Sequence, residues 1–392
     1  MKILLVIHEK FDPNSGAAGS IIKLGNEYRR LGHEVDYYSM DDLPQKMHYL
    51  AKEVLFPEFL AFYIASKVKK EKFDVIDAST GDIWFWAKVL QKFSKFRPLL
   101  VTRSHGLEHL LHLKCVEDDR AGNARLSWKY PFYRGSILLS EVAASLKHSD
   151  LIFLLNCQEK KYAISNLHIE AGKIKVVANG IPDTFLNLPI KPSSKSKEDI
   201  IRIAQIGTYI PRKGIQYGTP ALNTILARYP NVKVTFLGTE CRECSSVGQV
   251  YADFDHNVRD RITVIPRYNH ANLPELLKEH HIKLFPTLSE GFALSLIEAM
   301  ACGLAPITTA HPAALETVKD GCDAVVVPLH NVEAIEQALN LLIEDRDYLE
   351  TLRYGAYATA QNYSWNSIAK ESLSTYKKSL ELKKGYFRKS SK

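Results

Sequence analysis

Long apolar runs and cysteine are both scarce in this sequence of 392 residues. The longest uninterrupted apolar runs, such as residues 151–155, are far shorter than the roughly 20 residues that a membrane-spanning helix requires. No transmembrane helix is therefore expected. Polar residues 8–10 interrupt the first apolar run before an export signal could form, and 6 cysteines are too few for a disulfide framework. Both observations favour a reducing, cytoplasmic location.

Signals for a metal and for nucleic acid are weak as well. Cys241 and Cys244 form a lone C-x-x-C without a second pair at zinc spacing, and we find no D-x-D in a suitable loop. We expect no metal and no other cofactor. The net charge of +7 is modest for this length, so a nucleic-acid partner is not expected. Part of that charge forms a basic tail from Lys377 to Lys392, which is typical of a solvated helix end but can also contact anionic lipid headgroups.

Short apolar strands alternate with amphipathic helical segments along the whole chain. This alternation predicts an α/β protein with mostly parallel, doubly wound sheets. Because single cores stop growing near about 250 to 300 residues, the length favours two such Rossmann-like domains. Strands are expected at residues 2–7, 35–39, 75–77, 99–102, 151–155, 175–177, 201–206, 233–237, 262–264, 282–285, 305–308 and 324–327.

A break in composition separates the two series of strands. Residues 186–199 are rich in Pro, Ser and Lys and have no apolar periodicity, so we expect a linker there, between domains at residues 1–185 and 200–362. Residues 332–384 are expected to be helical, with an interruption near 362–364. Two domains of this kind face a cleft, and open α/β sheets bind ligands at the carboxyl ends of their strands.

The most informative loop follows the strand that ends at Phe285. It carries Glu290, and a helix is expected from about Phe292 to Cys302, with Glu298 on it. The unpaired N–H groups at a helix start attract phosphate. Eight helical steps would place the two carboxyl groups roughly 12 Å apart along the axis, too far for the pair of a retaining glycosidase, which lies about 5 to 5.5 Å apart. One Glu could hold a sugar and the other a ribose; alternatively, Glu298 is a solvated helix residue and Glu290 an N-cap.

The segment E-G-F-A-L-S-L-I-E, followed by A-M-A-C-G-L-A-P-I, resembles the E-x7-E signature of glycosyltransferase family 4, retaining enzymes of the GT-B fold that use nucleotide sugars. The resemblance implies that Glu290 approaches the donor sugar and that Glu298 binds the nucleotide ribose. It also implies that residues 363–392 cross back onto the first domain before ending in the basic tail. The backbone amides of Gly291, Phe292, Ala293 and Leu294 would receive the diphosphate.

The same resemblance assigns residues in other loops. Gly16 and Ala17 begin a stretch where the family has a glycine-rich loop near the phosphates and the acceptor, although a flexible turn explains them equally well. His105 directly follows a strand, at a place where the family often has a histidine that faces the donor sugar, although a structural histidine is the commoner case.

The loop after the first strand of the second domain departs from the family pattern. Lys213 occupies its expected place for neutralising the diphosphate, but Thr208 stands where an arginine is usual. We hypothesise that Arg212 supplies this charge from the neighbouring position; the alternative is that it points into solvent.

The resemblance implies metal-independent, retaining transfer of a hexosyl or similar group from a nucleotide-diphosphate sugar to a hydroxyl of a polysaccharide, lipid or small glycoside. Cell-envelope or polysaccharide biosynthesis fits such an activity. The alternatives are a sugar-nucleotide epimerase of the same fold and a catalytically weak sugar-nucleotide-binding subunit. The aromatic and basic residues of 44–72 indicate either a core-packed helix or a surface for peripheral contact with the inner face of the membrane, where a lipid-linked acceptor would lie.

Overall fold

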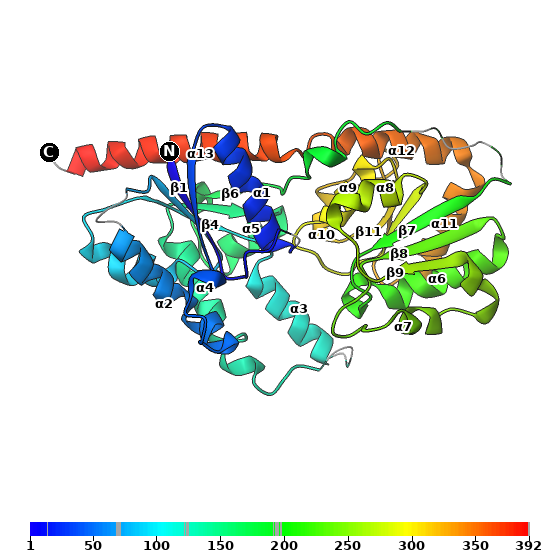
Figure 1. Ribbon diagram of the computed structural model, residues 1–392, viewed down its shortest axis with the longest axis horizontal. Coiled ribbons are helices and arrows are strands. Elements are labelled where there is room, and N and C mark those ends of the chain that lie inside the picture. The colour runs from blue at the N-terminus through cyan, green and yellow to red at the C-terminus, as the bar shows by residue number, and fades with distance from the viewer. Residues whose placement is uncertain are drawn as a thin grey trace. The chain divides into compact units, whose positions relative to one another are not determined.

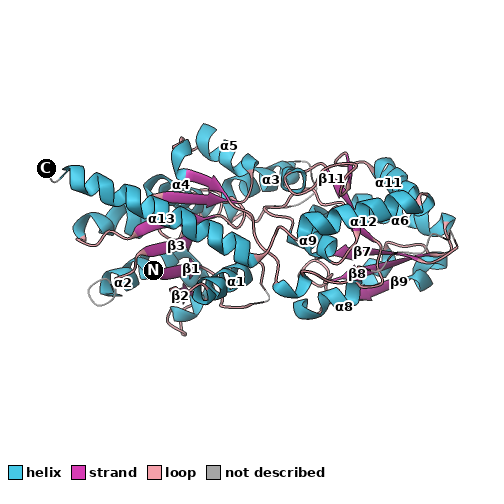
Figure 2. Ribbon diagram, turned by 90° about the horizontal axis from the view of Figure 1, so that it is seen from above, coloured by secondary structure: helices cyan, strands magenta, loops and turns pink. Residues whose placement is uncertain are grey.

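The computed structural model of the chain describes residues 1–13, 15–67, 72–120, 122, 125–190, 192, 196 and 198–390. The chain divides into two compact units. The first contains Met1–Gly180 together with Trp365–Lys392, and the second contains Ile181–Ser364. Each unit holds one sheet of six parallel strands, covered by helices (Figures 1 and 2).

The sheet of the first unit has the strand order β2-β1-β3-β4-β5-β6. The four inner strands of this sheet are buried on both faces, as is usual for parallel sheets, whereas the two edge strands, β2 and β6, are partly exposed. The order reverses between β1 and β3, so the switch point of this sheet lies there. The strands are β1 (Lys2–Ile7), β2 (Glu34–Ser39), β3 (Val75–Ser79), β4 (Leu99–Arg103), β5 (Leu151–Leu154) and β6 (Ile174–Val176).

Two sets of helices cover the two faces of this sheet. Ile3 and Leu5 point to the face that packs on α1 (Ala17–Arg30) and α13 (Trp365–Ser390), whereas Leu4 and Val6 pack on the face that contacts α2. The other helices of this unit are α2 (Tyr49–Lys67), α3 (Glu108–Arg120), α4 (Ile137–His148) and α5 (Cys157–Ser165).

The last helix, α13, is tied to the first unit by buried polar contacts. The hydroxyl of Tyr376 donates to Asp77 and accepts from Arg103 at 3.2 Å, and Arg103 itself donates to Asp77 at 2.8 and 3.0 Å. Lys383 donates to Asp150 near the same strands. Contacts between residues 233 to 299 positions apart in sequence therefore hold α13 against the first unit, where Figure 1 shows it.

The second unit has the strand order β12-β11-β10-β7-β8-β9, and its switch point lies between β7 and β10. Its strands are β7 (Ile201–Ile206), β8 (Val232–Leu237), β9 (Ile262–Ile265), β10 (Ile282–Phe285), β11 (Ala305–Thr309) and β12 (Val325–Val327). Its helices are α6 (Ile215–Arg228), α7 (Val247–Ala252), α8 (Leu273–Leu277), α9 (Leu294–Ala301), α10 (Pro312–Leu315), α11 (Val332–Glu344) and α12 (Arg346–Ala360).

The predicted fold class is confirmed, since all twelve predicted strands are present and both sheets are parallel. The C-terminal helical stretch has an additional break that the sequence prediction missed: Asp345 caps α12 by accepting from the Tyr348 amide at 2.9 Å. Residues 186–199, predicted as a linker, fall within the second unit, and some of them lie outside the described residues. Within the described part of the chain, no helix has the length and apolar character needed to cross a membrane.

Candidate active site

The two loops at the switch point of the second unit pack backbone against backbone. One follows β7 and ends at Gly214, and the other follows β10 from Pro286. Gly214 has φ +73°, and a Cβ there would lie 1.8 Å from the Pro286 carbonyl oxygen, so only glycine fits. The Leu288 amide donates to the Arg212 carbonyl oxygen at 3.0 Å. This close packing brings the side chains of the two loops together.

Glu290 lies at the centre of this loop pair. Its carboxylate forms an ion pair with Lys213, a second one with Arg212 at 3.4 Å, and accepts a hydrogen bond from the Thr287 hydroxyl at 3.3 Å. Burial by itself would raise the pKa of Glu290, but the Lys213 and Arg212 charges outweigh burial and lower that pKa. Glu290 is therefore an ionised carboxylate, with its side chain 13% exposed, that faces two cations.

Arg212 contacts the same carboxylate as Lys213. Its guanidinium donates to the Ser289 carbonyl oxygen at 2.9 Å as well as contacting Glu290, so it converges with Lys213 and does not point away into solvent. Two cations around one carboxylate leave the loop pair with an excess positive charge. An anionic group such as a diphosphate is attracted to such a site.

Glu298 lies on α9 and is buried. Its Oε1 accepts a hydrogen bond from His270 Nε2 at 2.6 Å, and the His270 ring packs on Phe185 with ring centroids 5.2 Å apart. The alternative of a solvated helix residue at Glu298 is therefore wrong. So is the alternative of an N-cap at Glu290, because the cap position of α9 is occupied by Ala293 and receives no side-chain hydrogen bond.

The start of α9 differs from the prediction. The helix begins at Leu294, not at Phe292, so the separation of roughly 12 Å deduced from eight helical steps does not apply to Glu290 and Glu298. The Leu294 amide donates to the Phe292 carbonyl oxygen at 3.0 Å and is thus already bonded. Ala293 is buried and Phe292 packs near Tyr363, with ring centroids 6.2 Å apart.

Two buried basic residues near this site were missed from the sequence. Lys283, in β10, is fully buried, and its Nζ has no hydrogen-bond partner. His311 lies between β11 and α10, and it too is buried with both ring nitrogens unpartnered. Burial and the Lys213 charge lower the pKa of His311 to about 4, although Glu290 opposes them. A histidine just after a strand is the signal that singled out His105, and it would also have found His311.

His105 lies in the first unit, just after β4. Both of its ring nitrogens are without a hydrogen-bond partner. Burial, followed by the charges of Arg103 and His8, lowers the pKa of His105 to about 3, so its imidazole is neutral at physiological pH. A neutral imidazole has one donor and one acceptor nitrogen, so it can donate a hydrogen bond to a sugar hydroxyl or accept one from it.

Gly16 and Ala17 stand at the start of α1. Gly16 caps the helix with ordinary right-handed backbone angles, and a Cβ there would meet nothing within 4 Å, so no steric demand requires a glycine. The carboxylate of Glu9 accepts from the Ala18 amide at 3.4 Å and from the Ser15 hydroxyl at 3.3 Å. An acidic side chain therefore occupies this helix start, which the sequence prediction did not anticipate.

Two family models match the chain, one in each half of the sequence. The model described as "Glycosyltransferase Family 4" matches residues 14–185, and the one described as "Glycosyl transferases group 1" matches residues 188–359. Together they span most of the chain, including the loop pair around Glu290. The chain belongs to the family 4 glycosyltransferases. The resemblance deduced from E-x7-E is thereby confirmed.

Known proteins similar to this glycosyltransferase agree with that assignment. The "Uncharacterized glycosyltransferase MJ1607" of Methanocaldococcus jannaschii is 24% identical over 97% of this chain and 99% of its own. Among solved structures, sucrose-phosphate synthase from Thermosynechococcus elongatus has a TM-score of 0.73 at 18% identity, covering 96% and 99% of the two chains. HepE from Anabaena, solved in complex with UDP, has a TM-score of 0.71 at 16% identity, covering 96% and 100%. Both likenesses show the fold.

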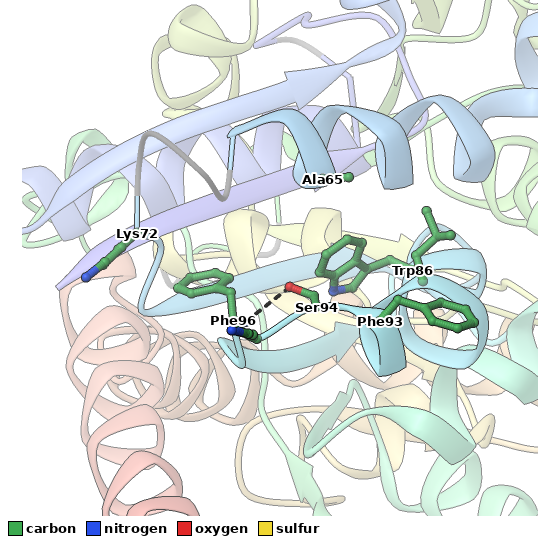
Figure 3. Close-up of a pocket in the computed structure, with 8 residues that line it drawn as sticks. Ala65, Lys72, Trp86, Phe93, Ser94 and Phe96 are labelled. Carbon is green, nitrogen blue, oxygen red and sulfur yellow. Dashed lines mark hydrogen bonds between the residues drawn. The ribbon is translucent and has the colours of Figure 1, made fainter.

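The glycosyltransferase also has an apolar pocket of about 730 Å³ in the first unit. Figure 3 shows it between Ala65 of α2 and the segment that contains Trp86 and Phe93. Lys72 and Phe96 line it and precede β3 and β4, so the pocket lies at the amino ends of these strands. Ligands of open α/β sheets bind at the opposite edge, and we assign no role in transfer to this pocket.

Proposed function

We propose that this glycosyltransferase moves a hexosyl or similar group from a nucleotide-diphosphate sugar to an acceptor hydroxyl, with retention of the anomeric configuration and without a metal ion. One observation carries the proposal: Lys213 and Arg212 converge on Glu290 at the switch point of the second sheet. The complex of HepE with UDP supports a nucleotide as the donor's leaving group.

The loop pair provides what the departure of a nucleotide requires. Negative charge develops on the diphosphate as the glycosidic bond breaks, and fixed cations next to it stabilise the transition state. With a donor bound, the phosphates share Lys213 and Arg212 with Glu290, whose carboxylate is then available to a hydroxyl of the donor sugar. The start of α9, from Gly291 to Leu294, remains the expected neighbour of the diphosphate.

The remaining residues act on other parts of the reactants. Glu298 is oriented by His270 through Oε1, which leaves Oε2 for a ribose hydroxyl. His105, neutral and unpartnered, donates to or accepts from a hydroxyl of the donor sugar. The acceptor hydroxyl attacks on the face from which the nucleotide departs, and the diphosphate takes the proton. This route retains the configuration.

A thermal-shift panel of nucleotide sugars tests donor binding, because a ligand that binds only the folded state raises its apparent stability. Arg212→Ala and Lys213→Ala should each remove a charge-assisted contact of about 1.5 to 3 kcal/mol, which corresponds to a loss of about ten- to hundredfold in donor affinity or rate. Lys319→Ala, an exposed lysine of the same unit, is the matched control. Unchanged affinity and rate in the Arg212 variant would refute its role.

The product distinguishes transfer from the alternatives. Proton NMR of the first product formed should show the same anomeric configuration as the donor sugar. A chelator should leave the rate of transfer unchanged. Turnover of the donor without any acceptor would instead indicate an epimerase. Donor binding without turnover in the presence of varied saccharide and lipid-linked acceptors would indicate a binding subunit, which the threonine at position 208 would explain.

We further propose peripheral contact with a membrane that carries a lipid-linked acceptor. Helix α2 buries Phe56 and Leu60 in the core but leaves Leu50 and Phe62 58% and 61% exposed, and Trp128 is 75% exposed. Exposed aromatic and aliphatic side chains of this kind insert at the headgroup boundary.

Two lysines of the basic end of this segment, at positions 69 and 70, lie outside the described residues. Flotation with anionic liposomes at low salt should recover the protein, and Phe62→Ser should weaken recovery; no flotation of the wild type would exclude the contact.

A further inference from the structure

A small cavity at the carboxyl ends of the first sheet contains several acidic side chains. It has a volume of about 40 Å³ and lies beside the switch point between β1 and β3. Loops after three neighbouring strands reach it, because His8 follows β1, Asp82 follows β3 and Glu108 follows β4. We call the following lining residues the acidic pocket: His8, Glu53, Thr80, Asp82, Glu108 and Glu141.

The charges of the acidic pocket are unbalanced. His8 Nδ1 pairs with Asp82 at 2.8 Å, and Asp82 raises the pKa of His8 to about 9 even though burial opposes this. Arg134 pairs with Glu53 at 2.9 Å. Within the described residues, Glu108 and Glu141 form no ion pair, although the His8 charge acts on Glu108.

Hydroxyl groups are the partners of these two carboxyls. Glu108 accepts from Thr80, and Glu141 accepts from Tyr133 at 3.4 Å. Burial raises the pKa of both Glu108 and Glu141 to about 7. The His8 charge opposes this rise at Glu108 without cancelling it, and no cation among the described side chains pairs with either carboxyl.

Two carboxylate oxygens of the pocket also lack a hydrogen-bond donor. Asp82 is 3% exposed and its Oδ2 has no hydrogen-bond partner. Glu108 Oε2 is a buried atom and likewise has no hydrogen-bond partner. An unsatisfied buried acceptor costs about 1 to 3 kcal/mol. Native proteins seldom leave such atoms unsatisfied, so a ligand that donates hydrogen bonds to these oxygens would remove this cost.

We propose that the acidic pocket binds a primary ammonium group of the acceptor, so that the acceptor is an amine-bearing compound such as an amino sugar. This inference rests on the proposed transfer function, because it names the acceptor class for that reaction. An ammonium carries three donors and no acceptor, which suits the unpartnered oxygens of Asp82 and Glu108. It also supplies the missing positive charge.

Other occupants fit less well. A hydroxyl donates a single proton and leaves the excess negative charge uncompensated. A metal ion needs a set of three or more suitable side chains, and the part of the chain that the structure describes holds no such set. A cavity of about 40 Å³ accepts one small group, so the amine end enters and the ring of the acceptor stays outside.

The test compares three probes that differ in one group: methyl glucosaminide, its N-acetyl derivative and methyl glucoside. Isothermal titration of the full-length protein near neutral pH should show binding of the free amine only. Glu108→Gln removes the charge with little change of shape and should weaken amine binding about ten- to hundredfold. Glu117→Gln, on the exposed side of the same helix, is the matched control and should bind as the wild type does.

Each outcome decides between the proposals. Equal binding of all three probes, or amine binding that Glu108→Gln leaves unchanged, overturns the ammonium site. So does the absence of amine binding in a protein that the nucleotide-sugar panel stabilises. A nucleotide shift in Glu108→Gln equal to that of the wild type shows that the variant is folded. If amine binding depends on Glu108 but no nucleotide sugar stabilises the protein, the ammonium site is supported and the proposed transfer function is refuted.

Discussion

Replacing the buried Lys283 by methionine should stabilise the second unit. Lys283 is in the central strand β10 with no exposed surface and no hydrogen-bond partner for Nζ, and its ammonium lies 5.4 Å from the centre of the Phe285 ring. Burial is the main cause that lowers its pKa well below the usual value, and the Lys213 charge adds to it. Methionine has a similar length and volume and requires neither hydration nor a partner.

The size of the effect follows from proton linkage. A lysine whose pKa is lowered by folding binds fewer protons in the folded than in the unfolded state, so its contribution to stability improves as pH rises toward the unfolded value of about 10.4. Methionine has no such dependence. The advantage of Lys283→Met should therefore be greatest at low pH and fall by about 1.4 kcal/mol per pH unit above the folded-state pKa. Over the 1.5 pH units from about pH 7.5 to pH 9, this advantage falls by about 2 kcal/mol.

Thermal unfolding of wild type and variant at these two pH values measures the difference. For a unit of this size, about 2 kcal/mol corresponds to a change of about 4 to 8 °C in the melting-temperature difference. Lys319→Met, at an exposed position of the same unit, should show no pH-dependent difference. A melting-temperature difference for Lys283→Met that is equal at both pH values would refute the reasoning, because Lys283 would then be protonated in the folded state.

Two further substitutions test the packing that places the site and the C-terminal helix. Gly214→Ala puts a Cβ where the Pro286 carbonyl oxygen lies and demands a left-handed backbone from alanine, so the loop pair should separate and the thermal shift from the nucleotide donor should vanish; a donor affinity within threefold of the wild type would contradict this. Asp77→Ala leaves the buried Arg103 without its carboxylate and should destabilise the first unit by about 3 to 5 kcal/mol in urea denaturation, whereas a loss below about 1 kcal/mol would show that the pair contributes little.

The strands were predictable because their signal is local. An apolar run such as residues 201–206, followed by a turn and an amphipathic segment, is sufficient to indicate a buried parallel strand and its crossover helix. The same rules locate the loops at the carboxyl ends of the strands, where Glu290 and Lys213 lie. Helix ends were less predictable: the break at Asp345 depends on one side-chain cap, and the first turn of α9 is delayed to Leu294.

Which charged groups meet was decided by the tertiary structure. The carboxylate of Glu290 and its lysine partner are 77 residues apart, and the Tyr376–Asp77 contact joins residues 299 apart. Sequence periodicity reports only whether a side chain faces a core, so a lysine inside I-K-L-F gives no indication that its amine will be buried without a partner. The free energy of a buried charge depends on every group within a few ångströms, and chain topology determines those groups.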